Sequence, residues 1–148
     1  MSRIASLGLR TLCLPAAAVA VAVLLSGCAG GAHDAAVSSV VRLTERDFKI
    51  SPPNEVAAGD VILRVKNRGP DAHELIVVRA GKGALPLRGD GLTVSEEAVQ
   101  ASEVGALELG QPNSVRELHV HLTPGRYVLF CNMSGHYLGG MHANLVVH

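Results

Sequence analysis

The sequence lacks the features that mark several common classes of protein. Its 148 residues include 13 Lys and Arg and 13 Asp and Glu, so the formal net charge at pH 7 is zero and no charge of one sign dominates. No internal repeat is present, which gives no support to a repeat architecture. No long stretch shows the apolar stripe with a 3.6-residue period that is typical of an amphipathic helix. An all-helical fold is therefore not expected.

The first 27 residues have the pattern of an export signal. Arg3 and Arg10 flank a short charged region, and an apolar run follows from Leu12 to Leu25. Pro15 interrupts this run, which is too short for a comfortable membrane span. It ends in Leu25-Ser26-Gly27-Cys28, which resembles a bacterial lipoprotein signal, in which the cysteine is lipidated and becomes the mature N-terminus. An uncleaved anchor helix is the alternative. In either case we expect a membrane-anchored chain outside the cytoplasm, in the periplasm or on the outer face of the cell membrane.

The remaining chain is long enough for one domain only. Removal of residues 1–27 from 148 leaves 121 residues, which can form one core but not two domains. It also removes two arginines, so that 11 basic residues face 13 acidic ones and the formal net charge becomes −2. A nucleic-acid binder is therefore excluded. Residues 28–39 are small and polar, which predicts a linker, and about ten flexible residues reach roughly 16–19 Å. The domain, residues 40–148, would lie close to its membrane.

Cysteine is scarce, and its placement is informative. Cys13 lies inside the signal and Cys28 would carry lipid, so Cys131 is the one free thiol of the mature chain. Exported proteins usually pair or avoid their cysteines, because the compartment is oxidising. Coordination by a metal would keep a lone thiolate away from oxidants. The alternative is that Cys131 is a small buried apolar residue.

The domain itself has the pattern of a β-rich protein, because Val is abundant and Gly and Pro punctuate the chain. Between residues 80 and 91 the chain is Gly-rich and predicts a loop, and Thr93-Val-Ser-Glu96 predicts a capping box that opens a short helix, possible over residues 93–102. Seven or eight short strands with turns between them fit an all-β, antiparallel Greek-key β-sandwich. We expect these strands near residues 40–48, 61–65, 74–79, 104–109, 115–122, 126–131 and 142–148.

One loop near the C-terminus gathers the residues that carry chemistry. The segment Cys131-Asn-Met-Ser-Gly-His136-Tyr-Leu-Gly-Gly-Met141 holds a thiol, an imidazole and a thioether, and His73 lies just past a turn at the start of an upstream strand. Two imidazoles, one thiolate and a weak axial thioether are the ligands of an electron-transfer copper site. Sulfur favours Cu(I), and imidazole accepts both oxidation states. The pattern predicts copper.

Three stretches resemble the cupredoxins, the small blue-copper proteins of the plastocyanin and azurin type: Ala58-Gly59-Asp60-Val61, Ala72-His73-Glu74-Leu75, and the segment from Gly125 to Met141. The resemblance covers most of the mature chain. It implies a cupredoxin-like sandwich that holds one type 1 copper ion, with His73, Cys131 and His136 as equatorial ligands and Met141 as the long axial one. It also implies a monomeric electron-transfer protein, not an enzyme, that cycles Cu(I)/Cu(II) between membrane-associated redox partners.

The residue after the first ligand departs from the family pattern. In plastocyanin and azurin an Asn usually stands there, and its backbone N–H contacts the cysteine sulfur. Glu74 occupies that place in this sequence, and its amide can still donate.

Other interpretations stay open at this stage. An exported copper chaperone or storage protein that delivers Cu(I) to another protein is the main alternative, and a structural lipoprotein without a metal is a third. His119 and His121 alternate on a predicted strand and would share one face, where they could chelate a second metal weakly, although paired surface histidines are usually only solvated. Met133 and His142 are further candidate ligands, but we expect Met133 to pack within its loop and Met141 to be the better ligand.

Overall fold

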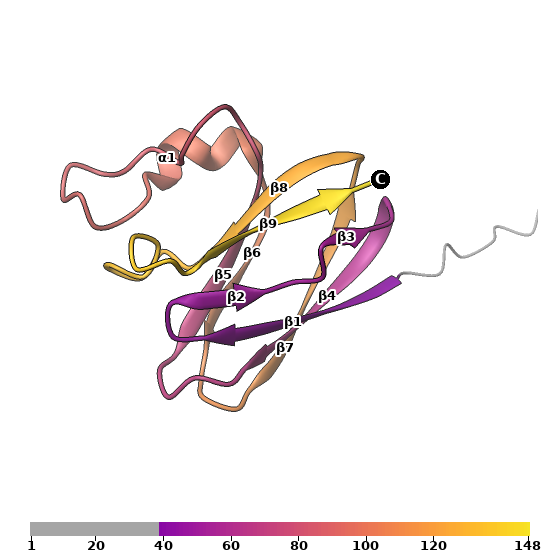
Figure 1. Ribbon diagram of the computed structural model, residues 1–148, viewed down its shortest axis with the longest axis horizontal. Coiled ribbons are helices and arrows are strands. Elements are labelled where there is room, and N and C mark those ends of the chain that lie inside the picture. Colours follow the sequence, from indigo (N-terminus) through magenta and orange to yellow (C-terminus); the bar gives the residue numbers. More distant parts are fainter. Residues whose placement is uncertain (1–38) are drawn as a thin grey trace, which may run out of the picture. The chain divides into compact units, whose positions relative to one another are not determined.

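The computed structural model describes residues 39–148. The predicted signal, Cys28 and the linker up to residue 38 lie outside the described residues. Within them nine strands form two sheets, together with one short helix (Figure 1). The elements are β1 (Ser39–Arg46), β2 (Lys49–Ser51), β3 (Glu55–Val56), β4 (Gly59–Asn67), β5 (His73–Arg79), α1 (Glu96–Val99) with the 3-10 turn Gln100–Ser102, β6 (Glu103–Gly110), β7 (Val115–Leu122), β8 (Gly125–Phe130) and β9 (His142–Val147). No helix in this part of the chain is long and apolar enough to cross a membrane.

The first sheet has the strand order β2-β1-β4-β7, and the second has the order β3-β9-β8-β5-β6. The predicted all-β sandwich is confirmed, but the expectation of purely antiparallel pairing is wrong at two places. Strand β1 pairs with β4 in parallel, and β3 pairs with β9 in parallel. The first of these arises because the chain leaves the first sheet at β3 and then returns as β4 in the direction of β1.

The alternation of apolar and polar residues along β4 gives the sheet its buried face. Val61, Leu63 and Val65 are buried, whereas Arg64 between them is exposed. Because successive side chains in a strand point to opposite faces, this period of two predicts one face toward the core. On the neighbouring strand β7, Leu118 lies opposite Leu63 in the register. Each fully buried Val or Leu contributes about 1.5–3 kcal/mol of transfer free energy.

Several element boundaries differ from the predictions, among them the end of β1 and the start of α1. Strand β1 ends at Arg46, not at Phe48, because Asp47 and Phe48 form the turn to β2. The helix begins after Ser95, whose hydroxyl accepts a hydrogen bond from the N–H of Ala98 at 3.4 Å. The predicted capping residue, Thr93, donates its hydroxyl hydrogen to Asp90 instead, at 2.8 Å. The predicted helix is present, but its cap is two residues later.

Several connections meet at one end of the sandwich. These are the β1–β2 turn, the start of β5 and the loop from Cys131 to Met141 that joins β8 to β9. Ser39, where the described chain begins, lies at the other end of β1, opposite Val61 in the register. With about 3.3 Å per residue, the eight residues of β1 separate the two ends by roughly 26 Å.

Candidate metal centre

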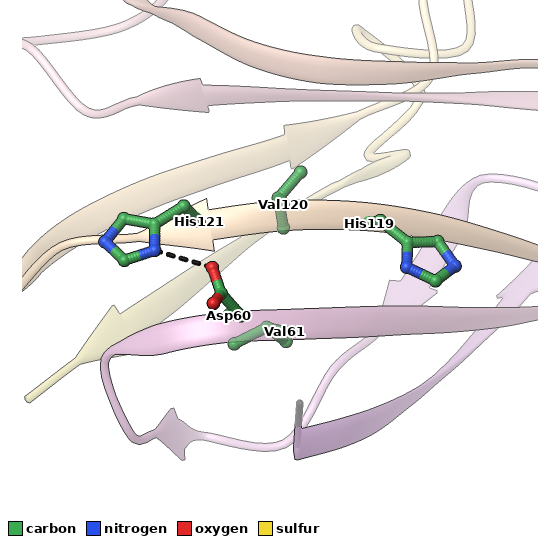
Figure 2. A pocket seen from close by; sticks show the side chains of 5 residues that line it. All are labelled: Asp60, Val61, His119, Val120 and His121. Atoms are coloured by element: carbon green, nitrogen blue, oxygen red, sulfur yellow. Dashed lines mark hydrogen bonds and ion pairs between the residues drawn. The ribbon is translucent and has the colours of Figure 1, made fainter. Parts of the chain in front are cut away.

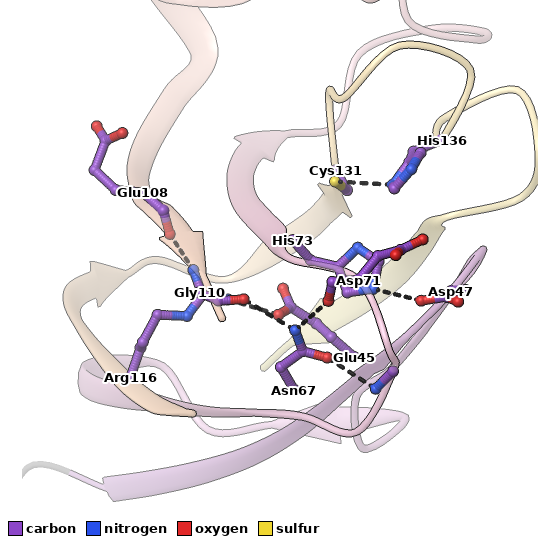
Figure 3. Close-up of polar contacts among 11 residues, drawn as sticks. Glu45, Asp47, Asn67, Asp71, His73, Glu108, Gly110, Arg116, Cys131 and His136 are labelled. Atoms are coloured by element: carbon purple, nitrogen blue, oxygen red, sulfur yellow. Dashed lines mark hydrogen bonds and ion pairs between the residues drawn. The ribbon is translucent and has the colours of Figure 1, made fainter. Parts of the chain in front are cut away.

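Three predicted ligands meet at this end of the sandwich. The donor atoms of His73, Cys131 and His136 all lie within 4.8 Å of one another. The sulfur of Cys131 is 3.5 Å from Nδ1 of His136 (Figure 3). Among the residues that the structure describes, this is the one group of three or more His, Cys, Asp or Glu donors placed closely enough to share an ion.

The ring of His73 is oriented by a carboxylate. Its Nε2 lies 3.0 Å from Oδ1 of Asp47, and its Nδ1 is buried without a hydrogen-bond partner in the described part of the chain. Because a carboxylate accepts hydrogen bonds, we assign the proton to Nε2, which leaves Nδ1 with its lone pair. Burial lowers the pKa of His73, and the hydrogen bond that its Nε2–H donates to Asp47 offsets this only in part, so the neutral form of the ring is favoured. A buried imidazole with a free lone pair is suited to bind a metal.

The Cys131 thiol is fully buried, and burial raises its pKa. The backbone N–H groups of Met133 and Glu74 donate to this sulfur and partly offset that rise, because they stabilise the thiolate. The amide of Glu74 thus makes the contact that the family pattern assigns to an Asn. The Glu74 carboxylate does not join the three donors, since it accepts a hydrogen bond from the N–H of Asn132 at 2.9 Å.

Backbone hydrogen bonds close the loop between β8 and β9. The N–H of Cys131 donates to the carbonyl of Met141 at 3.1 Å, and the N–H of Met141 donates to the carbonyl of His136 at 2.9 Å. The N–H of His136 in turn donates to the carbonyl of Met133 at 2.9 Å. Gly140 has a φ of 102°, a conformation that residues with a Cβ rarely adopt. The loop conformation is therefore set by the chain itself.

The side chain of Asn132 ties this loop to the segment before α1. Its Oδ1 accepts from the N–H of Val94 at 2.6 Å, and its Nδ2 donates to the carbonyl of Val94 at 3.1 Å and to Oε1 of Glu96 at 2.8 Å. An amide that satisfies both of its ends in this way holds two segments in one register. The position of Cys131, next to Asn132, is fixed by this contact.

The two methionines of the loop differ in burial. Met141 is fully buried and belongs to the same core cluster as Cys131. Met133 is partly buried and packs against that cluster, as expected for a loop-packing residue. The assignment of Met141 as the axial ligand stays a prediction.

His136 is the candidate ligand that reaches solvent. His73 and Cys131 are fully buried, whereas His136 is only partly so. The ring of Phe48 lies 5.3 Å from the ring of His136, centroid to centroid, and the Phe48 side chain is 51 % exposed. Phe48 also has a positive φ of 58°, which is unusual for a bulky residue. The turn places an exposed aromatic ring beside the accessible candidate ligand His136.

The remaining candidate ligands lie outside this group. His119 and His121 are exposed on the outer face of β7, as the alternation predicts, and His121 is bonded through Nδ1 to Oδ1 of Asp60 at 2.8 Å (Figure 2). Figure 2 shows the two imidazoles pointing apart along the strand. His142 is exposed, and its ring lies 4.9 Å from that of Tyr137.

Three residues at the site were not singled out from the sequence: Asp47, Phe48 and Asn132. Asp47 and Phe48 fall within the range predicted as the first strand, and no spacing relates Asp47 to His73, 26 residues away. Asn132 is adjacent to Cys131, and a polar residue next to a predicted ligand is a signal that could have drawn attention to it. Its contacts with Val94 depend on the fold.

Comparisons with known proteins establish the fold. No protein-family model and no curated protein matches the sequence. Among solved structures, auracyanin from Roseiflexus castenholzii is 17 % identical with a TM-score of 0.56, over 75 % of this chain and 98 % of that one. Auracyanin A, a "blue" copper protein from Chloroflexus aurantiacus, is 21 % identical with a TM-score of 0.56, over 75 % and 99 %. An azurin from Methylomonas sp. strain J is 13 % identical with a TM-score of 0.53, over 75 % and 98 %. The predicted cupredoxin-like fold is confirmed.

Proposed function

We propose that this chain is a copper-binding electron-transfer protein that holds one type 1 copper ion. His73, Cys131 and His136 are the equatorial ligands and Met141 is the weak axial one. The observation that carries the proposal is the buried Nδ1 of His73, which has no hydrogen-bond partner within residues 39–148. The donor atoms of His73, of the Cys131 thiol and of the second imidazole, His136, all lie within 4.8 Å of one another. A buried polar atom without a partner is costly, and a bound ion would remove that cost.

The chemical types of the donors fit copper. One thiolate and two imidazoles with a weak thioether suit an ion that alternates between a softer and a harder oxidation state. When bound, copper supplies a one-electron redox couple.

The chain's own residues would keep the coordination shell constant. Burial of His73, Cys131 and Met141 excludes water from three of the four ligands. Asp47 holds the ring of His73, and the loop hydrogen bonds hold Cys131, His136 and Met141. A cage fixed in this way rearranges little when its charge changes by one, which lowers the barrier to electron transfer. His136 is the partly exposed ligand, and its edge is where an electron enters or leaves.

Four protein ligands leave no open position for a substrate. For this reason we assign the site to electron transfer and not to an enzyme. The alternative function, an exported copper chaperone or storage protein, would need ligands that can be reached by an acceptor, and the burial of His73 and Cys131 gives it no support.

We also propose that the protein is exported and anchored through lipid on Cys28, and that its redox partners are associated with the same membrane. The support is the sequence alone: the charged start, the short apolar run and the small residues before Cys28.

The visible spectrum of the copper-loaded chain tests the proposed function. A Cu(II)–thiolate bond should give an intense visible charge-transfer band and a narrow copper hyperfine splitting. Cys131→Ser should abolish both while the circular dichroism spectrum of the sandwich is kept. A colourless Cu(II) complex of the unmodified chain would contradict the proposal and favour the handling of Cu(I).

A further inference from the structure

Basic side chains gather on one side of the first sheet. Of the 11 Lys and Arg residues between residues 39 and 148, six lie on β1, on β2, on β4 or directly after β4. Five of them are exposed and Lys66 is partly exposed. We call this surface the basic face: Arg42, Arg46, Lys49, Arg64, Lys66 and Arg68. It is hollowed at two adjoining places, both of which are lined by Thr44 and Arg68.

The register places like charges directly opposite each other. Arg42 lies opposite Arg64 across β1 and β4, and Arg46 lies opposite Lys49 across β1 and β2. Like charges in such pairs destabilise a sheet. Of the four residues in these two pairs, Arg64 alone has a carboxylate partner within the described chain. This arrangement points to a ligand of opposite charge.

Few carboxylates neutralise the basic face from within the described chain. Glu117 pairs with Arg64 at 2.6 Å. Glu45 on β1 points to the interior, where it pairs with Arg116. Asp47 is bonded to His73, and Asp60 is bonded to His121 toward the far end of the sheet. Within residues 39–148, no carboxylate lies within 4.0 Å of the basic groups of these residues: Arg42, Arg46, Lys49, Lys66 and Arg68.

Three acidic residues lie together elsewhere in the domain. Glu96, Glu97 and Glu103 line one hollow at α1 and the start of β6. Strand β6 is an edge of the second sheet, whereas the basic face belongs to the first. A domain with a formal charge near zero thus carries a separation of charge, and such a separation orients an approaching charged partner.

The basic face adjoins the candidate metal centre. Arg46 and Lys49 flank the turn of Asp47 and Phe48. Asp47 is bonded to the buried ligand His73, and Phe48 lies beside the accessible ligand His136. A partner seated on Arg46 and Lys49 would lie next to the edge of His136.

We propose that the basic face is the docking surface for an acidic redox partner, a protein that presents carboxylates around its own electron-transfer site. This inference rests on the proposed function, because it names the kind of redox partner that the copper site would serve. The basic face lies next to His136, and this favours a protein as the occupant, because a redox protein docked there would have a short electron-transfer distance to the site. For an anionic lipid surface, closeness to His136 brings no advantage. Binding of lipid is therefore treated as an alternative outcome of the test.

The test compares two double variants of the full chain in neutral detergent. Arg46→Glu/Arg68→Glu reverses two charges on the basic face, and Lys82→Glu/Arg126→Glu reverses two exposed charges outside it, with the same change in net charge. The probe is a fluorescein-labelled polyglutamate peptide, and its binding is followed by fluorescence anisotropy. We expect at least a roughly tenfold loss of affinity in the first variant, under about twofold in the second, and loss of binding by the unmodified chain in high salt.

A kinetic measurement tests whether the basic face guides electron transfer to the candidate metal centre. In the copper-loaded chain, the first variant should slow reduction by the anionic complex hexacyanoferrate(II) several-fold, and it should leave reduction by neutral hydroquinone unchanged. Equal slowing with both reductants would overturn the proposal, because the substitutions would then have disturbed the site itself.

Two outcomes of the binding assay would also overturn it. One is equal binding of the peptide by both variants. The other concerns lipid: the unmodified chain would bind soluble dihexanoyl-phosphatidylglycerol but not the phosphatidylcholine analogue, and the first variant alone would lose this lipid binding while it still binds the peptide. The occupant of the basic face would then be lipid. Peptide binding does not require copper. If the copper-loaded chain lacks the blue spectrum, the proposed function is refuted, but the peptide-binding result can still be interpreted.

Discussion

Burial of Glu45 should make the folded chain less stable as the pH rises. The side chain is fully buried on β1, and burial raises its pKa from 4.5 to about 7, although the guanidinium of Arg116, 2.6 Å away, acts in the opposite direction. Oε1 of Glu45 and Nε of Arg116 have no hydrogen-bond partner in the described chain, so the ion pair compensates only part of the desolvation. The folded state therefore binds a proton more tightly than the unfolded state does.

The direction and the size of this change in stability follow from the linkage between protonation and folding. The stabilisation from protonated Glu45 is fully present below the unfolded pKa of 4.5 and is lost as the pH rises through the folded pKa of about 7. At 1.36 kcal/mol for each pKa unit, the shift corresponds to a loss of about 3 kcal/mol in the free energy of unfolding between pH 4 and pH 8. This is a sizeable part of the stability of a small domain.

Urea unfolding of the metal-free chain at several pH values measures this effect. Glu45→Gln removes the titrating group, so the difference in unfolding free energy between the unmodified chain and this variant isolates Glu45 from the histidines. We expect the unmodified chain to lose about 3 kcal/mol relative to Glu45→Gln between pH 4 and pH 8. Glu117→Gln, which removes the exposed partner of Arg64, is the control and should change stability by under about 1 kcal/mol. Parallel curves for the unmodified chain and Glu45→Gln, or stability that rises with pH relative to the variant, would refute the reasoning.

Three further predictions concern the ligands and the anchor. Met141→Gln, which offers a harder oxygen donor, should lower the reduction potential in a redox titration while the colour largely persists, and Met133→Gln should not; the reverse result would make Met133 the axial ligand. Gly69→Ala would place a Cβ 2.4 Å from Oδ1 of Asp47 and 3.1 Å from Nε2 of His73, so copper affinity in a competition titration should fall about 10- to 100-fold, whereas Gly81→Ala, with no atom within 4 Å, should leave it unchanged. If Gly69→Ala leaves the copper affinity unaltered, the contact between Asp47 and His73 does not contribute to metal binding. Cys28→Ala should prevent lipidation and slow electron delivery in intact membranes while the copper spectrum persists, and an unmodified Cys28 in the mass spectrum of the unaltered protein would remove the basis for the anchor.

Apart from His73, which the family resemblance indicated, the parts of the site that could be predicted are those that are local in sequence. The loop from Cys131 to Met141 holds three candidate ligands within eleven positions, and the alternation along β4 and β7 predicted which faces are buried. The role of Asp47 could not be predicted, because its contact with His73 depends on how a turn of the first sheet meets the start of β5. The cap of α1 was displaced for a similar reason, since the carboxylate of Asp90 competes for the hydroxyl of Thr93. Parallel pairing of β1 with β4 depends on the path of β3, which is only two residues long.

The loop between β8 and β9 has a consequence for how such a protein can change over evolutionary time. Phe130 and His142 are paired in the register of the two strands, and between them the N–H of Cys131 bonds to the carbonyl of Met141, so the loop is closed at its base. An insertion or deletion inside this closed segment would alter the spacing of three candidate ligands, while the pairing of β8 with β9 outside it is kept. A change confined to this short stretch could therefore alter three of the four candidate ligand positions, whereas Asp47 and His73 lie on other elements and would keep their contact.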